Sequence, residues 1–201
     1  MDKMGKNIEL TVGYLQVMGV PPRYWHAKFA ALYDEQIEAM EGVIDEMEQD
    51  ITDCRGYYLY GPNGAGKSYL ASMLLKCGLM TYDHRAHWIT PDRIKEAFVD
   101  RTNLWDDTAN ISMYKRIHDV PHLIIDDIGK EYRGMSGYVQ TVLRLLIRYR
   151  YDYLRPTTIT SNMTPKEFSE IYGETLGSLF GGYLRPIEVK LADTRKLKKG
   201  A

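Results

Sequence analysis

Residues 61–68 read Gly61-Pro62-Asn63-Gly64-Ala65-Gly66-Lys67-Ser68 and match the pattern G-x-x-x-x-G-K-[ST] at every position. In such a loop, glycines let the backbone approach an anion closely, and the peptide N–H groups converge on the phosphates of a nucleoside triphosphate. We expect Lys67 to bring a positive charge to the β- and γ-phosphates and the Ser68 hydroxyl to ligate Mg²⁺. The loop and the residue after it, Tyr69, are therefore predicted to bind ATP.

The residues on either side of the loop fit this prediction. Gly56-Tyr57-Tyr58-Leu59-Tyr60 is a short aromatic run typical of a strand. Residues 69–76 have the pattern of a helix, with Leu70, Met73 and Leu74 on one face. A strand, a glycine loop and a helix in this order point the positive N-terminus of the helix at an anion.

Two acids follow a second apolar run, His122-Leu123-Ile124-Ile125-Asp126-Asp127-Ile128-Gly129. Such a run is typical of a buried strand in a parallel sheet, and ligands bind at the carboxyl ends of such strands. We expect Asp126 to hold Mg²⁺ and Asp127 to orient or deprotonate the attacking water. The alternative is that both acids merely cap the passage from strand to loop.

A third predicted strand, Thr157-Thr158-Ile159-Thr160, ends at Ser161-Asn162. An asparagine at this strand end can hydrogen-bond the γ-phosphate or the lytic water, although Ser-Asn alone is an ordinary turn signal. Together with the other two predicted strands, this position makes Asn162 a candidate for contact with the γ-phosphate or the lytic water.

The composition is that of one soluble globular domain, with 201 residues of which 44% are hydrophobic and 26% charged. The net charge of −1 gives no global field that would draw the chain to DNA or to anionic lipid. Cys54 and Cys77 form no disulfide or metal pattern, and no apolar run approaches the roughly 20 residues of a membrane span. With no signal-peptide core at the N-terminus, we expect a cytoplasmic protein without membrane contact.

The chain divides into a short leader (1–20), an entry segment with an amphipathic helix (21–54), a nucleotide-binding core (55–196) and a basic tail (197–201). The helix is predicted over residues 28–49, with an acidic outer face. The leader carries apolar residues at helical spacing, namely Leu10, Tyr14, Val17 and Met18.

Strands and helices alternate beyond residue 56, which predicts an α/β fold in which a parallel five-stranded sheet has helices on both faces. The remaining elements expected are a strand at 87–90, a helix opened by Pro91, helices at 108–118, 136–153 and 165–172, and a last strand at 187–191.

Five segments together resemble the AAA+ ATPases, and more narrowly the DnaC/DnaI/IstB-like group of helicase loaders and transposition helpers. The resemblance covers about residues 15–196. Gly19-Val20-Pro21-Pro22-Arg23-Tyr24 is similar to the entry motif G-[IV]-P-x-R-Y of that group. The others are the phosphate loop with its flanks (59–71), the run with the two acids (123–129), a segment similar to the sensor-1 strand (155–163), and Ala192-Asp193-Thr194-Arg195, which resembles the terminus that carries the sensor-2 arginine.

The resemblance implies a P-loop AAA+ (ASCE) fold and a protein that hydrolyses ATP with Mg²⁺, and we expect this fold to have no separate helical lid domain. It further implies assembly as an ATP-dependent homo-oligomer on single-stranded DNA, with a replicative hexameric helicase or a transposase as partner. Arg195 would be sensor 2, and Ser136 and Tyr138 match a segment that faces DNA in the loaders. The expectation that a helical lid domain is lacking departs from the group and comes from the few residues that follow Arg195.

One motif of the group is altered. Its arginine-bearing helix, G-E-R-x-x-D-R, aligns with residues 173–180, where both arginines are absent. We expect Arg185 to be the nearest substitute, acting on the nucleotide of a neighbouring subunit. A helicase loader is the leading hypothesis. The alternatives are a transposase-assisting ATPase and a nucleotide-dependent binding module with little hydrolysis.

Overall fold

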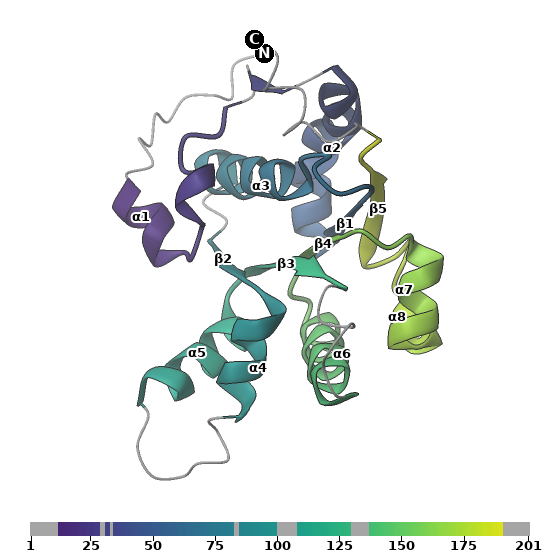
Figure 1. Ribbon diagram of the computed structural model, residues 1–201. Coiled ribbons are helices and arrows are strands. Elements are labelled where there is room, and N and C mark those ends of the chain that lie inside the picture. Colours follow the sequence, from purple (N-terminus) through teal and green to yellow (C-terminus); the bar gives the residue numbers. More distant parts are fainter. Residues whose placement is uncertain are drawn as a thin grey trace.

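The computed structural model describes residues 12–28, 31–32, 34–82, 85–99, 108–129 and 137–190. Its centre is an all-parallel sheet of five strands in the order β2-β3-β4-β1-β5, which confirms the predicted α/β fold (Figure 1). Because β4 lies between β1 and β3, the carboxyl ends of these three strands are neighbours. The strands are β1 Gly56–Tyr60, β2 Ala86–Ile89, β3 His122–Ile128, β4 Thr157–Ser161 and β5 Leu184–Glu188.

Helices cover both faces of the sheet (Figure 1). Alternate residues of β1 serve the two faces, since Tyr57 and Leu59 pack under α1, α2 and α3 while Tyr58 packs against α4 to α8. The helices are α1 Val12–Val17, a 3₁₀ turn Pro22–Tyr24, α2 Asp34–Thr52, α3 Lys67–Tyr82, α4 Pro91–Val99, α5 Thr108–Asp119, α6 Gly137–Asp152, α7 Pro165–Tyr172 and α8 Glu174–Gly177. No helix in these described ranges is both long and apolar enough to cross a membrane.

The last strand begins earlier than predicted. It runs from Leu184 to Glu188 rather than over 187–191, and it pairs with β1 from Gly56↔Leu184 to Tyr60↔Glu188. Pro186 is tolerated because β5 is an edge strand, where a missing N–H can face away from the ladder. Likewise α2 begins at Asp34 rather than at residue 28.

The predicted leader contributes to the core, but through a different face of its helix. Leu15 and Met18 are buried, whereas Tyr14 and Val17, which the helical spacing grouped with Met18, are 39% and 64% exposed. The carbonyl of Met18 accepts the Trp88 N–H at 2.7 Å. Residues 12–20 thus cover the free edge of β2, which would otherwise offer unpaired backbone groups.

Arg150, at the end of α6, is fully buried although its side chain carries a charge. Burial lowers the pKa of Arg150 to about 10, so the guanidinium keeps its charge at neutral pH. It joins α5, α6 and the starts of β3 and β4. Its five hydrogen bonds go to Thr157 Oγ1 (2.9 Å) and to the carbonyls of Ile117 (2.9 Å), His118 (3.1 Å), Pro121 (3.4 Å) and Pro156 (2.9 Å).

Candidate nucleotide-binding site

The phosphate loop leaves β1 and enters α3 at Lys67, as the motif requires. Gly61 has φ 147° and Gly66 has φ 95°, in the region that favours glycine. A Cβ at Gly61 would lie 2.2 Å from the Val189 carbonyl oxygen, and one at Gly66 would lie 2.1 Å from Gln36 Nε2. Both glycines are therefore needed for their conformation and for the close approach of neighbouring atoms.

Lys67 is 7% exposed, and its ammonium group is held at the centre of the predicted site. Nζ donates to the carbonyls of Gly61 and Pro62, each at 2.8 Å, and to Asn162 Oδ1 at 2.7 Å. The first two acceptors belong to the loop itself, and the third lies just after β4. The structure therefore brings together Lys67 and Asn162, which are 95 residues apart in the sequence.

The two acids at the end of β3 have different surroundings. Asp126 is 8% exposed and accepts the Thr160 hydroxyl at 2.6 Å, while Thr160 Oγ1 accepts the Asp127 N–H at 2.7 Å. The register between β3 and β4 shifts between Ile125 and Ile128, and Asp127 has φ 73°, uncommon for a residue other than glycine. This bulge separates a fixed, buried carboxylate from a half-buried one, as two different roles would need.

Ser161 fixes the chain on both sides of Asn162. Its hydroxyl donates to the Ile128 carbonyl at 2.9 Å and accepts the Met163 N–H at 3.1 Å. Asn162 is thereby carried on a rigid strand end between the loop and the acids, which suits a residue that must contact a phosphate or a water.

The residues present fit a Mg²⁺–nucleotide. A buried ammonium can neutralise phosphate charge, and the Ser68 hydroxyl and Asp126 carboxylate offer the hard oxygen atoms that Mg²⁺ prefers. Across the described ranges no three His, Cys, Asp or Glu side chains form a group that could by itself hold a metal ion. A magnesium ion needs no such group, since it takes most ligands from phosphates and water. The assignment of Ser68 and Asp126 to the metal stays a prediction.

The entry segment is tied to α3 by two side chains. The Tyr69 hydroxyl accepts the Lys28 N–H at 2.7 Å and donates to the Lys28 carbonyl at 2.9 Å. Lys76, nearly buried, donates to the carbonyls of Tyr24 (3.0 Å), Trp25 (2.9 Å) and Ala27 (3.0 Å), and desolvation lowers its pKa. Tyr69, predicted to contact the nucleotide, thus holds the segment beside the loop, and no sequence pattern had marked Lys76.

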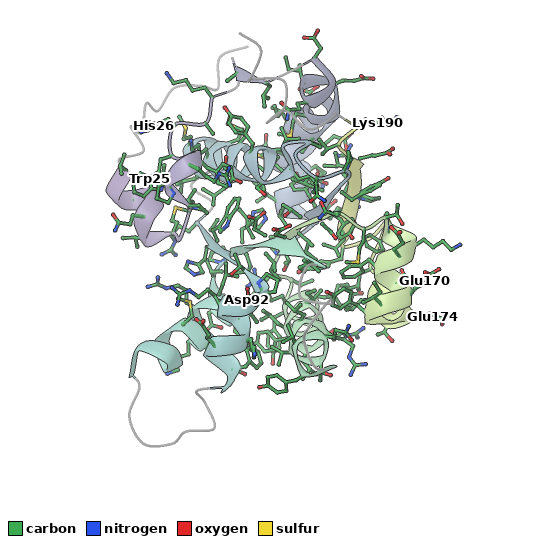
Figure 2. The ribbon with its side chains drawn as sticks, viewed as in Figure 1. Trp25, His26, Asp92, Glu170, Glu174 and Lys190 are labelled. Atoms are coloured by element: carbon green, nitrogen blue, oxygen red, sulfur yellow. The ribbon has the colours of Figure 1, made fainter. Side chains whose placement is uncertain are left out.

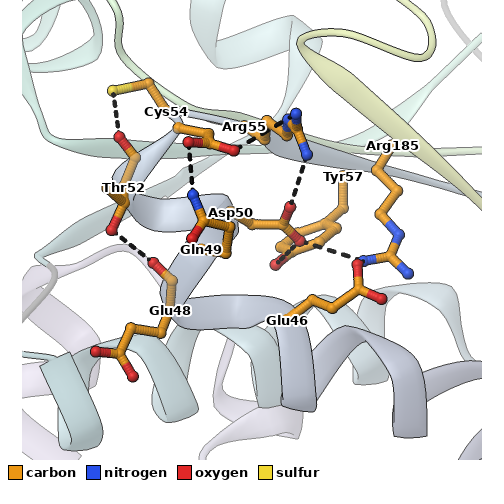
Figure 3. Close-up of polar contacts among 10 residues, drawn as sticks. Glu46, Glu48, Gln49, Asp50, Thr52, Cys54, Arg55, Tyr57 and Arg185 are labelled. Atoms are coloured by element: carbon orange, nitrogen blue, oxygen red, sulfur yellow. Dashed lines mark hydrogen bonds and ion pairs between the residues drawn. The ribbon is translucent and has the colours of Figure 1, made fainter.

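Arg185 lies in β5, with its side chain on α2. Its Nη1 contacts Glu46 Oε2 at 2.5 Å and Asp50 Oδ2 at 3.4 Å (Figure 3). Asp50 is 1% exposed and also accepts the Tyr57 hydroxyl at 2.9 Å. Burial, with a smaller contribution from the Asp50 carboxylate, raises the pKa of Tyr57. Arg185 pairs with Tyr57 near the start of β1, whereas the phosphate loop follows the end of that strand. Its action on a neighbouring subunit stays a prediction.

The segment aligned with the arginine-bearing helix packs into the core. Leu179, at one of the arginine positions, is 4% exposed and Leu176 is fully buried, while Glu170 and Glu174 point outward (Figure 2). Leu179 therefore fills space where the group's motif places a cation.

The predicted DNA contacts are described only in part. Tyr138 lies on the first turn of α6 and is 42% exposed, so it is accessible to a partner. Ser136 and the predicted sensor-2 residue Arg195 lie outside the described residues.

Comparison with solved structures identifies the architecture. A DnaC helicase loader aligns with a TM-score of 0.73 at 22% identity, over 85% of this chain and 100% of that one. A putative primosome component from Streptococcus pyogenes serotype M3 gives 0.64 at 22% identity, over 86% and 90%. The replication initiator DnaA bound to AMPPCP and single-stranded DNA gives 0.62 at 20% identity, over 90% of this chain and 56% of that one. No protein-family model and no curated protein sequence matches. The chain therefore has the P-loop AAA+ fold of the DnaC helicase loader and the DnaA initiator.

Proposed function

We propose that this chain is an ATP-binding and ATP-hydrolysing protein that loads or remodels a replicative DNA helicase on single-stranded DNA during replication. The observation that carries the proposal is the position of the Lys67 ammonium, held by two loop carbonyls and by Asn162 of the neighbouring strand end. That arrangement places a cation, an amide and the acids of β3 at the carboxyl ends of three adjacent strands, where ligands of parallel sheets bind.

The residues have separate roles in this proposal. The loop N–H groups and Lys67 would bind the phosphates. On binding, phosphate oxygens would replace oxygens that now accept hydrogen bonds from the Lys67 ammonium. Ser68 and Asp126 would hold Mg²⁺, which would supply charge that offsets the negative phosphates. Asp127 orients the water and takes its proton, and Asn162 holds the water or the γ-phosphate. Arg195 acts within its own subunit, and Arg185 on the nucleotide of a neighbour.

Two features favour assembly before DNA binding. The chain is nearly neutral, with a net charge of −1, so a single subunit has no general attraction for a polyanion. Tyr138 is exposed and can stack on a base, a contact worth roughly 1–3 kcal/mol in single-strand binders. An ATP-dependent oligomer would align several such tyrosines along one strand. The likeness to a DnaC helicase loader supports a replicative helicase as partner in the cytoplasm.

A second function, a nucleotide-dependent binding module with little hydrolysis, is favoured by two observations. Leu179 is buried where the group's motif has an arginine, and Arg185 is ion-paired with Glu46 within its own subunit. A trans-acting arginine is worth 10³–10⁵ in rate in other NTPases, so its lack would leave binding intact and turnover slow.

The two functions are separated by measuring turnover and DNA binding on the same protein. The full chain is assayed for phosphate release from Mg·ATP with and without single-stranded DNA, and for DNA binding with ATP, ADP or no nucleotide. The loader proposal predicts that DNA binding requires ATP and that single-stranded DNA raises turnover. The binding-module function predicts that DNA binding requires ATP and that turnover stays near background with and without single-stranded DNA. Tight DNA binding by the nucleotide-free protein would contradict both.

Loading itself is tested with the replicative helicase of the same host on circular single-stranded DNA. The amount of helicase retained on the circle should rise with this protein and ATP, and should not rise with the Lys67→Ala variant. Equal retention in the absence of this protein would contradict the loader proposal.

A further inference from the structure

We infer that Gln36, in the first turn of α2, is a positioning residue that sets the orientation of the Ala65–Gly66 peptide in the phosphate loop. This inference rests on the proposed function, because it concerns the same phosphate site. Nothing in the sequence marks Gln36, which lies before the loop in a helix whose outer face is acidic.

Gln36 is 4% exposed, so its amide is removed from water and needs protein partners. Its Nε2 donates to the Ala65 carbonyl at 2.8 Å, and Ala65 is itself fully buried. A buried amide that holds a backbone carbonyl of the motif from 29 residues away restricts the rotation of that peptide unit.

The peptide geometry gives this bond a consequence. No cis peptide bond occurs in the part of the chain that the structure describes, so the Ala65–Gly66 unit is trans. In a planar trans peptide the C=O and the following N–H point in opposite directions. Because Gln36 holds the Ala65 carbonyl toward α2, the Gly66 N–H is directed away from α2. The inference assigns that side to the phosphates, which such N–H groups cradle.

Gly66 is shaped to the same contact. Its φ of 95° suits glycine, and a Cβ there would lie 2.1 Å from Gln36 Nε2. A side chain at position 66 and the Gln36 amide therefore cannot occupy this place together. The glycine thus serves the approach of Gln36 as well as the bend of the loop.

Helix α2 carries Gln36 in its first turn, and its C-terminal half is fixed to the sheet by side-chain contacts. Glu46 and Asp50 hold Arg185 of β5, and Asp50 also accepts the Tyr57 hydroxyl of β1 (Figure 3). A side chain carried on a helix that is fixed to the sheet can hold a loop peptide more closely than one carried on a loop.

The test compares Gln36→Leu and Gln36→Glu with the matched variants Gln49→Leu and Gln49→Glu in the full chain. Gln49 lies on the same helix but is exposed, and it donates to Asp53 at 2.8 Å. We expect Gln36→Leu to weaken ADP and ATP binding by about 10-fold, since one oriented hydrogen-bond donor to the phosphates is lost. Gln36→Glu should weaken it further, because its carboxylate repels both the Ala65 carbonyl and the phosphates. Both Gln49 variants should bind like the wild type.

A second measurement begins with the wild type and so does not depend on the folding of a variant. In the wild-type protein, the Gly66 amide proton should move downfield in the NMR spectrum when ADP is added, as a donor to a phosphate does. The shift should shrink in Gln36→Leu while the unfolding temperature stays near that of the wild type.

The outcomes separate the inference from the proposed function. If the wild type binds ADP and Lys67→Ala does not, yet Gln36→Leu binds normally or the Gly66 amide ignores ADP, the inference is wrong and the function stands. If affinity falls in Gln36→Leu only in step with the unfolding temperature, Gln36 merely supports the fold and the inference is also wrong. If the wild type binds no nucleotide, the proposed function fails, and this inference fails with it.

Discussion

Lys67 and Arg150 are buried cations near opposite ends of β4, and both donate to backbone carbonyls. They differ in how firmly their acceptors hold them. The Arg150 guanidinium is a planar fork with five bonds to separate parts of the chain, and none can be exchanged without opening the core. The Lys67 ammonium is a compact charge, and two of its acceptors are carbonyls of its own loop.

Burial of a charged side chain therefore does not by itself indicate function. What distinguishes the two sites is the origin of the acceptors. Arg150 donates to carbonyls at the end of α5 and just before β3 and β4, so its charge stabilises the fold. Lys67 lies beside the glycine loop and the end of β4, where we propose that its charge serves a bound anion.

The largest effect is expected from Arg150→Met, which leaves several buried carbonyls without a donor. We expect a loss of at least about 3 kcal/mol in the free energy of unfolding, measured by urea denaturation. Arg148→Met is the control on the same helix. Arg148 is 47% exposed and paired with Asp152 at 3.0 Å, so its loss should cost less than about 1 kcal/mol. Similar losses for the two variants would contradict the structural role of Arg150.

Changes at Asp126 and Asp127 should affect only the nucleotide site. Asp127→Asn should slow ATP hydrolysis by roughly 10²-fold while ATP binding stays normal, because a general base is lost. Asp126→Asn should weaken Mg²⁺-dependent binding instead, because a metal ligand loses its charge. Phosphate release and nucleotide titration with and without Mg²⁺ distinguish the two variants, and one shared phenotype would show that the division of roles is wrong.

His87 extends the comparison to a buried base that is neutral. It is 4% exposed, and burial, with a smaller contribution from the charge of Arg116, lowers the pKa of His87 from 6.5 to about 4. As the pH falls through 6.5 the unfolded chain takes up the proton first, so stability is lost between pH 6.5 and about 4 and not further below. The loss amounts to at most about 3 kcal/mol.

The check is urea unfolding of the wild type and of His87→Gln at pH 7 and at pH 4.5. The wild type should lose more stability than His87→Gln over this interval. His26→Gln, at an exposed histidine, serves as the control and should follow the wild type. Parallel loss in all three proteins would mean that His87 is not buried as the neutral base.

The smallest effect is expected from Arg185→Ala. Turnover of the assembled protein should fall while ATP affinity of the single subunit stays unchanged, since Arg185 contacts Glu46 and Asp50 rather than its own phosphate loop. Mixing Arg185→Ala with Lys67→Ala subunits should restore part of the activity, because some interfaces then join an intact loop to an intact arginine. Wild-type turnover of Arg185→Ala alone, with no gain on mixing, would limit Arg185 to its ion pairs.

The sequence predicted the features that consecutive residues encode. The phosphate loop, the acids of β3 and the end of β4 each carry their conformation and their chemistry within a few residues, and α7 was predicted with its observed bounds. The start of β5 was predicted at residue 187, whereas the strand begins at Leu184, because an edge strand accepts Pro186. Arg150 was recognisable in principle, since it continues the inward stripe of Val139, Leu143 and Leu146 at helical spacing.

Other residues carried no local signal. Gln36 and Lys76 act on backbone carbonyls that lie 29 and 49 to 52 residues away, so only the folded arrangement of α2, α3 and the entry segment reveals them. A carbonyl is present at every position, and no residue pattern indicates which one a buried side chain will find.

The central claim is that residues 61–68 bind nucleotide phosphates through Lys67, and a nucleotide titration tests it most directly. Wild type and Lys67→Ala are titrated with a fluorescent ATP analogue in Mg²⁺, and urea denaturation confirms that both are folded. We predict at least about 100-fold weaker binding by Lys67→Ala, because a charge-assisted contact to the β- and γ-phosphates is lost. Binding within a few-fold of the wild type by a folded Lys67→Ala protein would contradict the account.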